Sequence, residues 1–288
     1  MTGIRPSRPG AEGVGWIDNS ASTSRLPPLN LREVWSNREL IRFFAIRDIK
    51  VRYKQAFLGI AWAGLRPLLG ALTFTLVFNR IATIDVGGRS YFAFALVGFS
   101  AWTYFSTAIT TGTTSLVANA DLLTKVAFPK VVAPASSLIP PMIDLTVGAT
   151  LAMVVAVAVG DGLSAAGLLV GLPLGVVLLV VAAAGPISFF SAAVVKYRDA
   201  AEVVGFGLYL LLFISPIAYP PELLSDHWQT ILHLNPLAGA LGLLRSGLTG
   251  SDLPGAHHVA LSALTAGVFF FVGLLHFRRH EHEFADIV

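Results

Sequence analysis

The sequence predicts an all-α integral membrane protein with six transmembrane helices. Only 13% of the 288 residues are charged and 55% are hydrophobic, whereas an ordinary soluble domain carries about 25% charged residues. A helix needs roughly 20 apolar residues to cross the hydrocarbon of a bilayer. Six apolar runs come close to or exceed this length, at residues 57–78, 90–117, 131–159, 163–195, 203–219 and 259–277.

The residues before the first span divide into two parts. Residues 1–29 are rich in Pro, Gly and Ser and contain no apolar run, which predicts a disordered cytoplasmic tail. Residues 30–54 mix aromatic and aliphatic side chains with many arginines, and Asn30 can cap a helix. We expect an amphipathic interface helix here that turns Val34, Trp35, Ile41 and Phe44 toward lipid and Arg32, Arg38, Arg42 and Arg47 toward the headgroups.

Residues 55–288 form the predicted six-span domain, and basic residues indicate its orientation. Lys and Arg favour the cytoplasmic side of a membrane. With six spans and a cytoplasmic N-terminus, sixteen of the 20 Lys and Arg residues lie inside. A further apolar run, 227–244, would place Arg278 and Arg279 outside if it crossed the membrane. We therefore expect 227–244 to be re-entrant or interfacial and both termini to be cytoplasmic.

Several kinds of chemistry are missing from the sequence. The chain has no cysteine, which excludes disulfides, thiolate metal sites and a cysteine nucleophile. It has no G-x-x-x-x-G-K-[ST] loop for the phosphates of ATP and no H-E-x-x-H metal motif. We expect no catalytic residue, no metal and no cofactor on this chain, which argues against an enzyme.

Two charged residues, Arg66 and Asp144, fall inside predicted spans. Each costs on the order of 2.5 to 3.5 kcal/mol at the centre of an isolated span. Their expected depths differ by roughly 5 Å, at 1.5 Å of rise per residue. We expect an ion pair between them. The alternatives are a proton relay, or separate contacts with water or polar neighbours.

Six motifs, taken together and in order, resemble a known family. They are RDIKVRYKQAFLGIAWAGLRPLL at 47–69, LLTKVAFPKVVAP at 122–134, VVKYRDA at 194–200, SPIAYP at 215–220, LNPL at 234–237 and FRRHEHEFADIV at 277–288. They are similar to the membrane subunit of polysaccharide-exporting ABC transporters of the ABC-2 type. The resemblance covers about residues 31–288. Arg66 departs from it, because relatives usually carry a neutral polar residue before Pro67.

This resemblance implies a transport subunit of the bacterial cytoplasmic membrane. The expected assembly is a homodimer with two copies of a separate ATPase subunit, which binds the ATP and Mg. The expected cargo is a polysaccharide linked to a polyprenyl pyrophosphate, such as a cell-wall galactan or an O-antigen, and no nucleic acid is involved. The resemblance also implies a coupling helix between spans two and three and two re-entrant gate helices after span five. The alternatives are an ABC-2 permease for a drug or lipid, a secondary transporter or flippase acting alone, and a membrane glycosyltransferase.

The loop between spans two and three is the candidate for coupling to the ATPase. It is a short amphipathic segment ended by a proline, which suits a helix that fits a groove on a partner. The other interpretation is an ordinary interfacial turn. The candidate coupling residues are Asp121, Leu122, Leu123, Lys125, Val126, Phe128, Pro129 and Lys130.

A cluster of cations lies where the interface helix enters span one. Clustered Lys and Arg can hold an anionic lipid headgroup. With the pyrophosphate cargo that the resemblance implies, the candidates for binding it are Arg47, Lys50, Arg52 and Lys54. The other interpretation is that these residues only anchor the cytoplasmic side.

Span two combines aromatic rings, on which sugars stack, with hydroxyl side chains that bind sugar hydroxyls. If the cargo is a glycan, this composition suits a channel wall. The candidates are Trp102, Tyr104, Phe105, Ser106, Thr107, Thr110 and Thr111, with Tyr209 and Tyr219 from span five. The aromatic members could instead belong to the core or to the belt at the membrane interface.

Overall fold

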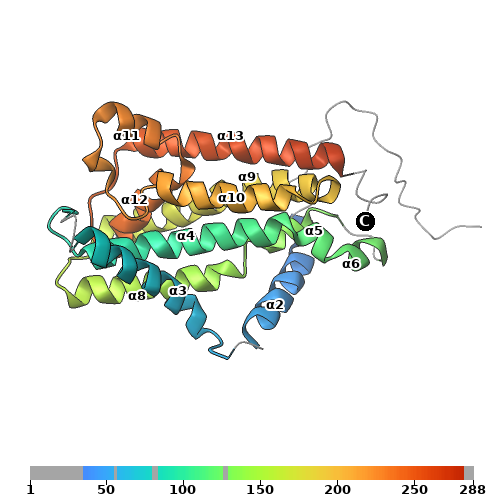
Figure 1. Cartoon of the computed structure of the whole chain (residues 1–288), viewed down its shortest axis with the longest axis horizontal. Helices are drawn as coiled ribbons and strands as arrows, with labels where there is room; N and C mark the ends of the chain where they lie inside the picture. Colours follow the sequence, from blue (N-terminus) through green and yellow to red (C-terminus); the bar gives the residue numbers. More distant parts are fainter. Residues whose placement is uncertain (1–34, 55–56, 80–83, 126–128, 282–288) are drawn as a thin grey trace, which may run out of the picture.

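The computed structural model describes residues 35–54, 57–79, 84–125 and 129–281, and every regular element in these ranges is a helix. The helices form an elongated bundle, with α2 oblique to its long axis (Figure 1). In chain order they are α2 Arg38–Lys54, α3 Ala61–Phe74, η1 Thr75–Asn79, α4 Tyr91–Thr113, α5 Ser115–Ala118, α6 Ala120–Lys125, α7 Val132–Ser136, α8 Pro141–Ala158, η2 Gly167–Gly171, α9 Leu172–Lys196, α10 Ala200–Ile214, η3 Pro221–Leu223, α11 Asp226–Leu232, α12 Pro236–Leu248 and α13 Ala256–His280.

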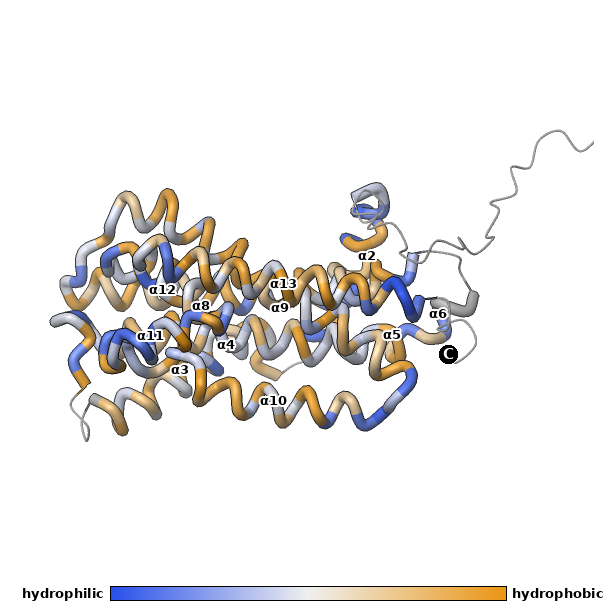
Figure 2. Tube along the Cα trace, turned by 90° about the horizontal axis from the view of Figure 1, so that it is seen from above, coloured by the Kyte–Doolittle hydropathy of each residue, from blue (hydrophilic) through white to orange (hydrophobic). Residues whose placement is uncertain are grey.

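The bundle has two distinct ends. One end carries α5, α6 and the last turns of α13, and we call it the α6 end (Figure 1). The opposite end carries α11 and α12, and we call it the α11 end. Polar residues gather toward the two ends and along α2, whereas the middle of the bundle is largely apolar (Figure 2). This distribution is the one expected of helices that cross a bilayer.

Five helices in the described part of the chain are long and apolar enough to cross a membrane. They are Ala61–Phe78, Tyr91–Thr113, Val132–Ala158, Gly167–Lys196 and Ala256–His280. They match the first, second, third, fourth and sixth predicted spans. The expectation of an all-helical membrane protein is therefore confirmed.

The fifth predicted span is shorter than expected. Apolar helix α10 has 15 residues, about 22 Å at 1.5 Å per residue. It ends at Ile214 because Ser215 precedes a proline and adopts extended backbone angles, φ −78° and ψ 147°. The prediction that this helix continues to residue 219 is wrong.

The segment between α10 and α13 stays at one end of the bundle. Helix α10 finishes at the α11 end, α11 and α12 lie there, and α13 starts from there (Figure 1). Residues 227–244 therefore do not add a full crossing between the two ends. This agrees with the sequence argument that such a crossing would place Arg278 and Arg279 outside.

Helix α4 is the centre of the core. It packs against α3, α8 and α9, and α10 and α12 also touch it. Its side chains Leu96, Tyr104 and Phe105 are among the largest fully buried groups of the protein. Because lipid tails are as apolar as these side chains, close van der Waals packing rather than water exclusion holds such helices together.

Helices pack closely where η2 and α9 meet α12. Gly167, Gly171 and Gly175 recur at every fourth position, a spacing that predicts close helix packing. In the structure a Cβ at Gly167 would lie 2.0 Å from the carbonyl oxygen of Ser246, and one at Gly175 would lie 3.0 Å from Leu244. The prediction is confirmed, and α12 is its packing partner.

Helix α2 packs against the bundle through buried side chains. Ile41 and Phe44 are buried and pack on Val132 of α7. The expectation that these two side chains face lipid is wrong. Trp35 is exposed, as are Phe43 and Val51, and Val34 lies outside the described residues. This segment therefore keeps an exposed apolar surface.

Candidate functional site

Asp144 anchors α2 to the bundle. Pro140 and Pro141 interrupt the third span, so that Asp144 lies in the first turn of α8, and its side chain is only 4% exposed. It accepts hydrogen bonds from Arg52 Nη1 at 3.1 Å and from Tyr53 Oη at 2.6 Å. Burial, followed by the hydrogen bond to Asp144, raises the pKa of Tyr53 to about 12. Tyr53 is therefore a protonated donor at neutral pH.

The predicted ion pair between Arg66 and Asp144 does not form in the structure. Asp144 is paired with Arg52 instead. Arg66 is exposed on α3, and its guanidinium lies 6.0 Å from the ring centroid of Trp62. Counting residues gives the depth of Asp144 only if the third span is unbroken. The break at Pro140 and Pro141 puts Asp144 in the first turn of α8, so the count no longer gives its depth.

The four candidate pyrophosphate ligands fall into two groups. Arg52 is engaged with Asp144, and Arg47 forms an ion pair with Asp48 at 2.7 Å and covers the ring of Phe44. Lys50 and Lys54 are exposed. Spacings of three and four residues place Arg47, Lys50 and Lys54 along one face of α2. The structure thus does not bring all four cations together.

The coupling candidates lie at the α6 end. Asp121 and Leu122 are exposed on α6, and Lys130 donates a hydrogen bond to the carbonyl of Glu281 at 2.8 Å. Leu123 and Lys125 are residues of α6. Val126 and Phe128 lie outside the described residues, and Pro129 is the first residue after them. A short helix with an exposed leucine therefore stands at this end of the bundle.

The channel candidates of α4 occupy two different surroundings. Tyr104 and Phe105 are buried in the core, and the Tyr104 hydroxyl donates to the carbonyl of Leu138 at 3.3 Å. Their burial is at odds with a channel-lining role. Trp102 is half-buried and packs on Phe105, with ring centroids 6.0 Å apart. The core interpretation thus holds for Tyr104 and Phe105.

The hydroxyl groups of α4 form a more accessible stripe. Thr110 and Thr111 are exposed, whereas Ser106 and Thr107 are half-buried. The hydroxyls of Ser106, Thr110 and Thr111 donate to backbone carbonyls four residues earlier at 2.7 to 2.8 Å. Each hydroxyl oxygen can still accept a hydrogen bond. The stripe can therefore contact a polar cargo without leaving a donor unpaired.

The two candidates from the fifth span lie at different places on α10 and its end. Tyr209 is 60% exposed and meets the ring of Phe213 edge-on, with centroids 5.4 Å apart. Tyr219 follows the helix and donates to the carbonyl of Ile214 at 2.7 Å. Tyr209 is thus open to a neighbour, and Tyr219 helps to close the end of α10.

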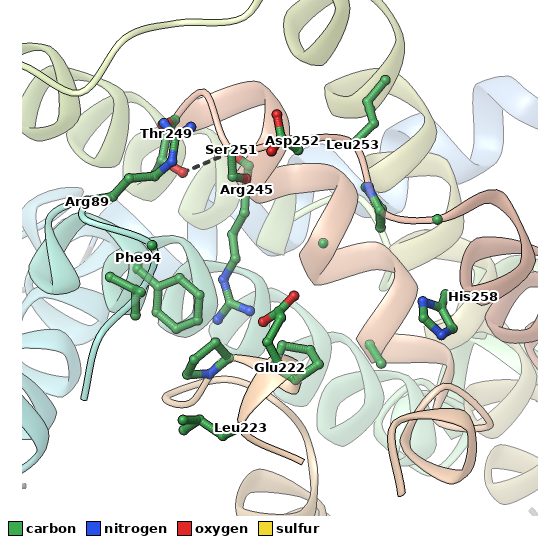
Figure 3. A pocket seen from close by; sticks show the side chains of 18 of the residues that line it. Arg89, Phe94, Glu222, Leu223, Arg245, Thr249, Ser251, Asp252, Leu253 and His258 are labelled. Atoms are coloured by element: carbon green, nitrogen blue, oxygen red, sulfur yellow. Dashed lines mark hydrogen bonds between the residues drawn. The ribbon is translucent and has the colours of Figure 1, made fainter. Parts of the chain in front are cut away.

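The α11 end contains a cavity of about 600 Å³. Its wall comes from four stretches of the chain: the loop before α4 with the first turn of α4, η3, α11, and the stretch from α12 to the first turn of α13 (Figure 3). The carboxylates on it are Asp85, Glu222 and Asp252, all on exposed residues. Figure 3 shows the Arg245 side chain running between Phe94 and Glu222.

Arg245 holds the loop that follows α10. It is 4% exposed, donates to the carbonyl of Ile217 at 2.8 Å and lies 3.5 Å from the ring centroid of Phe94. Tyr91 of α4 donates to the next carbonyl, Ala218, at 2.5 Å. Residues 217 and 218 are thus fixed to both α12 and α4.

Three histidines cluster beside this cavity. The rings of His233 and His258 are 4.0 Å apart and nearly parallel, and His257 lies 3.8 Å from His258. Burial, with smaller effects of His258 and His257, lowers the pKa of His233 to about 4. His233 is therefore neutral at physiological pH. The described residues contain no group of three or more potential ligands arranged to hold a metal ion.

Comparison with known families decides the class of protein. The family model described as "ABC-2 type transporter" matches residues 39–249, well over half of the chain. The chain belongs to the ABC-2 type transporter family. The matched region extends from α2 to the end of α12, so it includes the Asp144 anchor, α6 and most of the cavity at the α11 end.

Curated relatives of this ABC-2 protein have the same extent. It is 27% identical to an O-antigen export system permease protein RfbA from Klebsiella pneumoniae over 87% of this chain and 95% of the relative. It is 28% identical to a protein of that name from Myxococcus xanthus over 90% of this chain and 98% of the relative. The chain is thus an ABC-2 permease with a transport role, and the family implies an ATPase partner.

Arg245 is the residue of this ABC-2 protein that sequence reasoning missed. The apolar run at 227–244 ends just before Arg245, so the sequence predicts Arg245 in an outer loop. The structure extends α12 to Leu248 and buries Arg245 in it. A charge within an otherwise apolar helix was the signal that could have identified it.

Proposed function

We propose that this chain is the membrane subunit of an ABC exporter that moves a lipid-linked polysaccharide outward across the bacterial cytoplasmic membrane. The observation that carries the proposal is the match to O-antigen export permeases over nearly their whole length, at 26 to 28% identity. The proposed assembly is a homodimer with two ATPase subunits that bind ATP and Mg. The proposed cargo carries a polyprenyl pyrophosphate, as an O-antigen or a cell-wall galactan does.

The arrangement of the bundle supports an orientation with the α6 end in the cytoplasm. Helix α2 with its exposed Lys50 and Lys54 packs near this end, and α13 finishes there with Arg278 and Arg279 (Figure 1). Basic residues favour the cytoplasmic side. In this orientation α6 faces the ATPase, α2 lies at the inner interface, and the pair α11 and α12 is re-entrant at the outer face.

The cations of α2 support a site for an anionic headgroup. Lys50 and Lys54 are exposed on the face that also carries Arg47. Clustered cations at a membrane surface attract anionic headgroups by about 1 kcal/mol per residue. We assign first contact with the pyrophosphate to Lys50 and Lys54, because Arg52 is occupied by Asp144.

Depletion of the chain in its native bacterium tests this function. Lipid-linked polysaccharide should accumulate on the cytoplasmic side, while the same polymer disappears from the cell surface. Complementation with the intact chain should restore export. Unchanged surface polymer, together with altered drug resistance or lipid composition, would contradict the proposal and favour an ABC-2 permease for a drug or lipid.

A further inference from the structure

We propose that the cavity at the α11 end binds a neutral saccharide unit of the exported glycan. This inference rests on the proposed function, and it assigns a ligand class to a site far from the α6 end. The cavity of about 600 Å³ has the size of small-molecule sites, which range from about 300 to 1,000 Å³.

The charges around the cavity disfavour an anionic ligand. Asp85, Glu222 and Asp252 contribute three carboxylates. The two arginines of the wall are already bound to backbone carbonyls, Arg89 to Thr249 at 2.7 Å and Arg245 to Ile217 at 2.8 Å. The wall thus carries three carboxylates against two arginines, and this excess of negative charge disfavours a phosphate or uronic acid. Hydroxyl groups, in contrast, can donate to these carboxylates.

Two buried polar atoms in the wall indicate the same ligand class. Nε of Arg245 and Nδ1 of His233 have no hydrogen-bond partner among the described residues, and each residue is 4% exposed. An unpaired buried polar group costs about 1 to 3 kcal/mol. Nε of arginine can only donate, whereas Nδ1 of neutral histidine donates or accepts. A hydroxyl group matches both atoms because it donates and accepts, and because both atoms are buried in this structure, such pairing requires the wall to open around them.

The position of the cavity indicates what saccharide binding there would do during export. In the proposed orientation it lies at the outer face, beside residues 217 and 218, which Arg245 and Tyr91 fix. A sugar held there as the polymer leaves the bundle would resist sliding back between strokes. The acidic side chains are exposed on the rim, and the unpaired nitrogens are deeper in the wall.

Single-cysteine labelling tests the inference, since the chain has no native cysteine. The Ser251→Cys variant places a thiol on the cavity wall, and Ser225→Cys places one on an exposed residue that does not line the cavity. The complex with its ATPase, in nanodiscs, is labelled with a maleimide with and without a β-linked galactose disaccharide. A bound ligand slows labelling by 1 + [L]/Kd, about threefold at twice the Kd.

We expect the disaccharide to slow labelling at residue 251 and to leave residue 225 unchanged. Glu222→Ala should reduce this protection at least threefold, whereas Asp226→Asn, on an exposed residue outside the cavity wall, should not change it. Equal labelling with and without the disaccharide, or protection that survives Glu222→Ala, would overturn the site.

The same complex separates the site from the function on which it rests. If it exports lipid-linked glycan on addition of ATP but shows no protection at residue 251, only the saccharide site is wrong. If the disaccharide protects residue 251 and no glycan is exported, the site stands and the proposed function is wrong.

Discussion

Asp144 is the residue whose partners in the structure differ most clearly from the predicted one. Its carboxylate is buried and receives two hydrogen bonds from the last turn of α2. Removing one partner of a buried ion pair is costly because the other charge stays behind. Asp144 therefore links the interface helix to the bundle, and its role is positional.

We predict that Asp144→Asn lowers the unfolding free energy by about 2 kcal/mol, because a hydrogen bond to a charged group contributes about 1.5 to 3 kcal/mol and Arg52 is partly exposed. Thermal unfolding of the purified complex, with proteolysis of α2 as a local probe, measures this loss. In a double-mutant cycle, Arg52→Gln should be non-additive with Asp144→Asn.

Arg66→Gln is the matched control, because Arg66 is a cation of the neighbouring span that lies against Trp62. Its effect should add to that of Asp144→Asn. If the effect of Asp144→Asn added to that of Arg52→Gln but was coupled to that of Arg66→Gln, the partner of Asp144 would be Arg66 and not Arg52.

The partner of Asp144 could not be predicted from the sequence. Counting residues along uninterrupted helices places Arg66 and Asp144 at similar depths, but Pro140 and Pro141 break the third span. The sequence predicts Arg52 only as a headgroup ligand, since nothing in its local sequence shows that the end of α2 meets the start of α8. Contacts between residues 92 positions apart depend on packing.

At the scale of elements, the contact between η2, α9 and α12 depends on missing side chains. Gly167 approaches the backbone of Ser246 so closely that a methyl group has no room. Gly267 of α13 has no atom within 4 Å of its would-be Cβ. The two glycines therefore offer opposite surroundings for the same substitution.

We predict that Gly167→Ala destabilises the chain by about 1 to 3 kcal/mol, the usual cost of overpacking. Gly267→Ala should be neutral or stabilising by up to about 1 kcal/mol, because alanine is the better helix former. Thermal unfolding of both variants in the same detergent measures the difference. A larger loss from Gly267→Ala would show that the packing surfaces are assigned to the wrong helices.

Helix α6 is the second element with a testable role. Leu122 is 39% exposed at the α6 end, so a substitution there spares the core. We predict that Leu122→Asp reduces co-purification of the ATPase at least tenfold, about 1.4 kcal/mol, because a charge replaces an apolar contact.

Val159→Asp serves as the control for α6. Val159 is similarly apolar, 56% exposed, and follows α8 at the α11 end. This variant should bind the ATPase normally. Normal ATPase binding by Leu122→Asp would contradict the coupling role of α6.

At the scale of the whole molecule, the class of fold and most spans were predictable from the sequence. The length of an apolar run corresponds directly to bilayer thickness, and five of the six runs form helices of the required length. The end of the fifth span was harder to predict, because Pro216 stops α10 early. The structure of residues 227–248 was also harder to predict, because α12 buries Arg245. The cavity at the α11 end joins four separate segments and has no local signature.

The orientation of the molecule gives a prediction at this scale. In intact spheroplasts, a membrane-impermeant maleimide should label Ser251→Cys, and it should label Ser36→Cys only after permeabilisation. These residues lie at the α11 end and at the start of the α2 segment. Labelling of residue 36 from outside would invert the proposed orientation.

The central claim is that this permease moves its cargo only with energy from a separate ATPase. Proteoliposomes that contain the permease with its ATPase and lipid-linked polysaccharide provide the most direct test, with appearance of the glycan on the opposite face as the readout. We predict transport that requires ATP and both proteins. Transport, or hydrolysis of ATP, by the permease alone would contradict it.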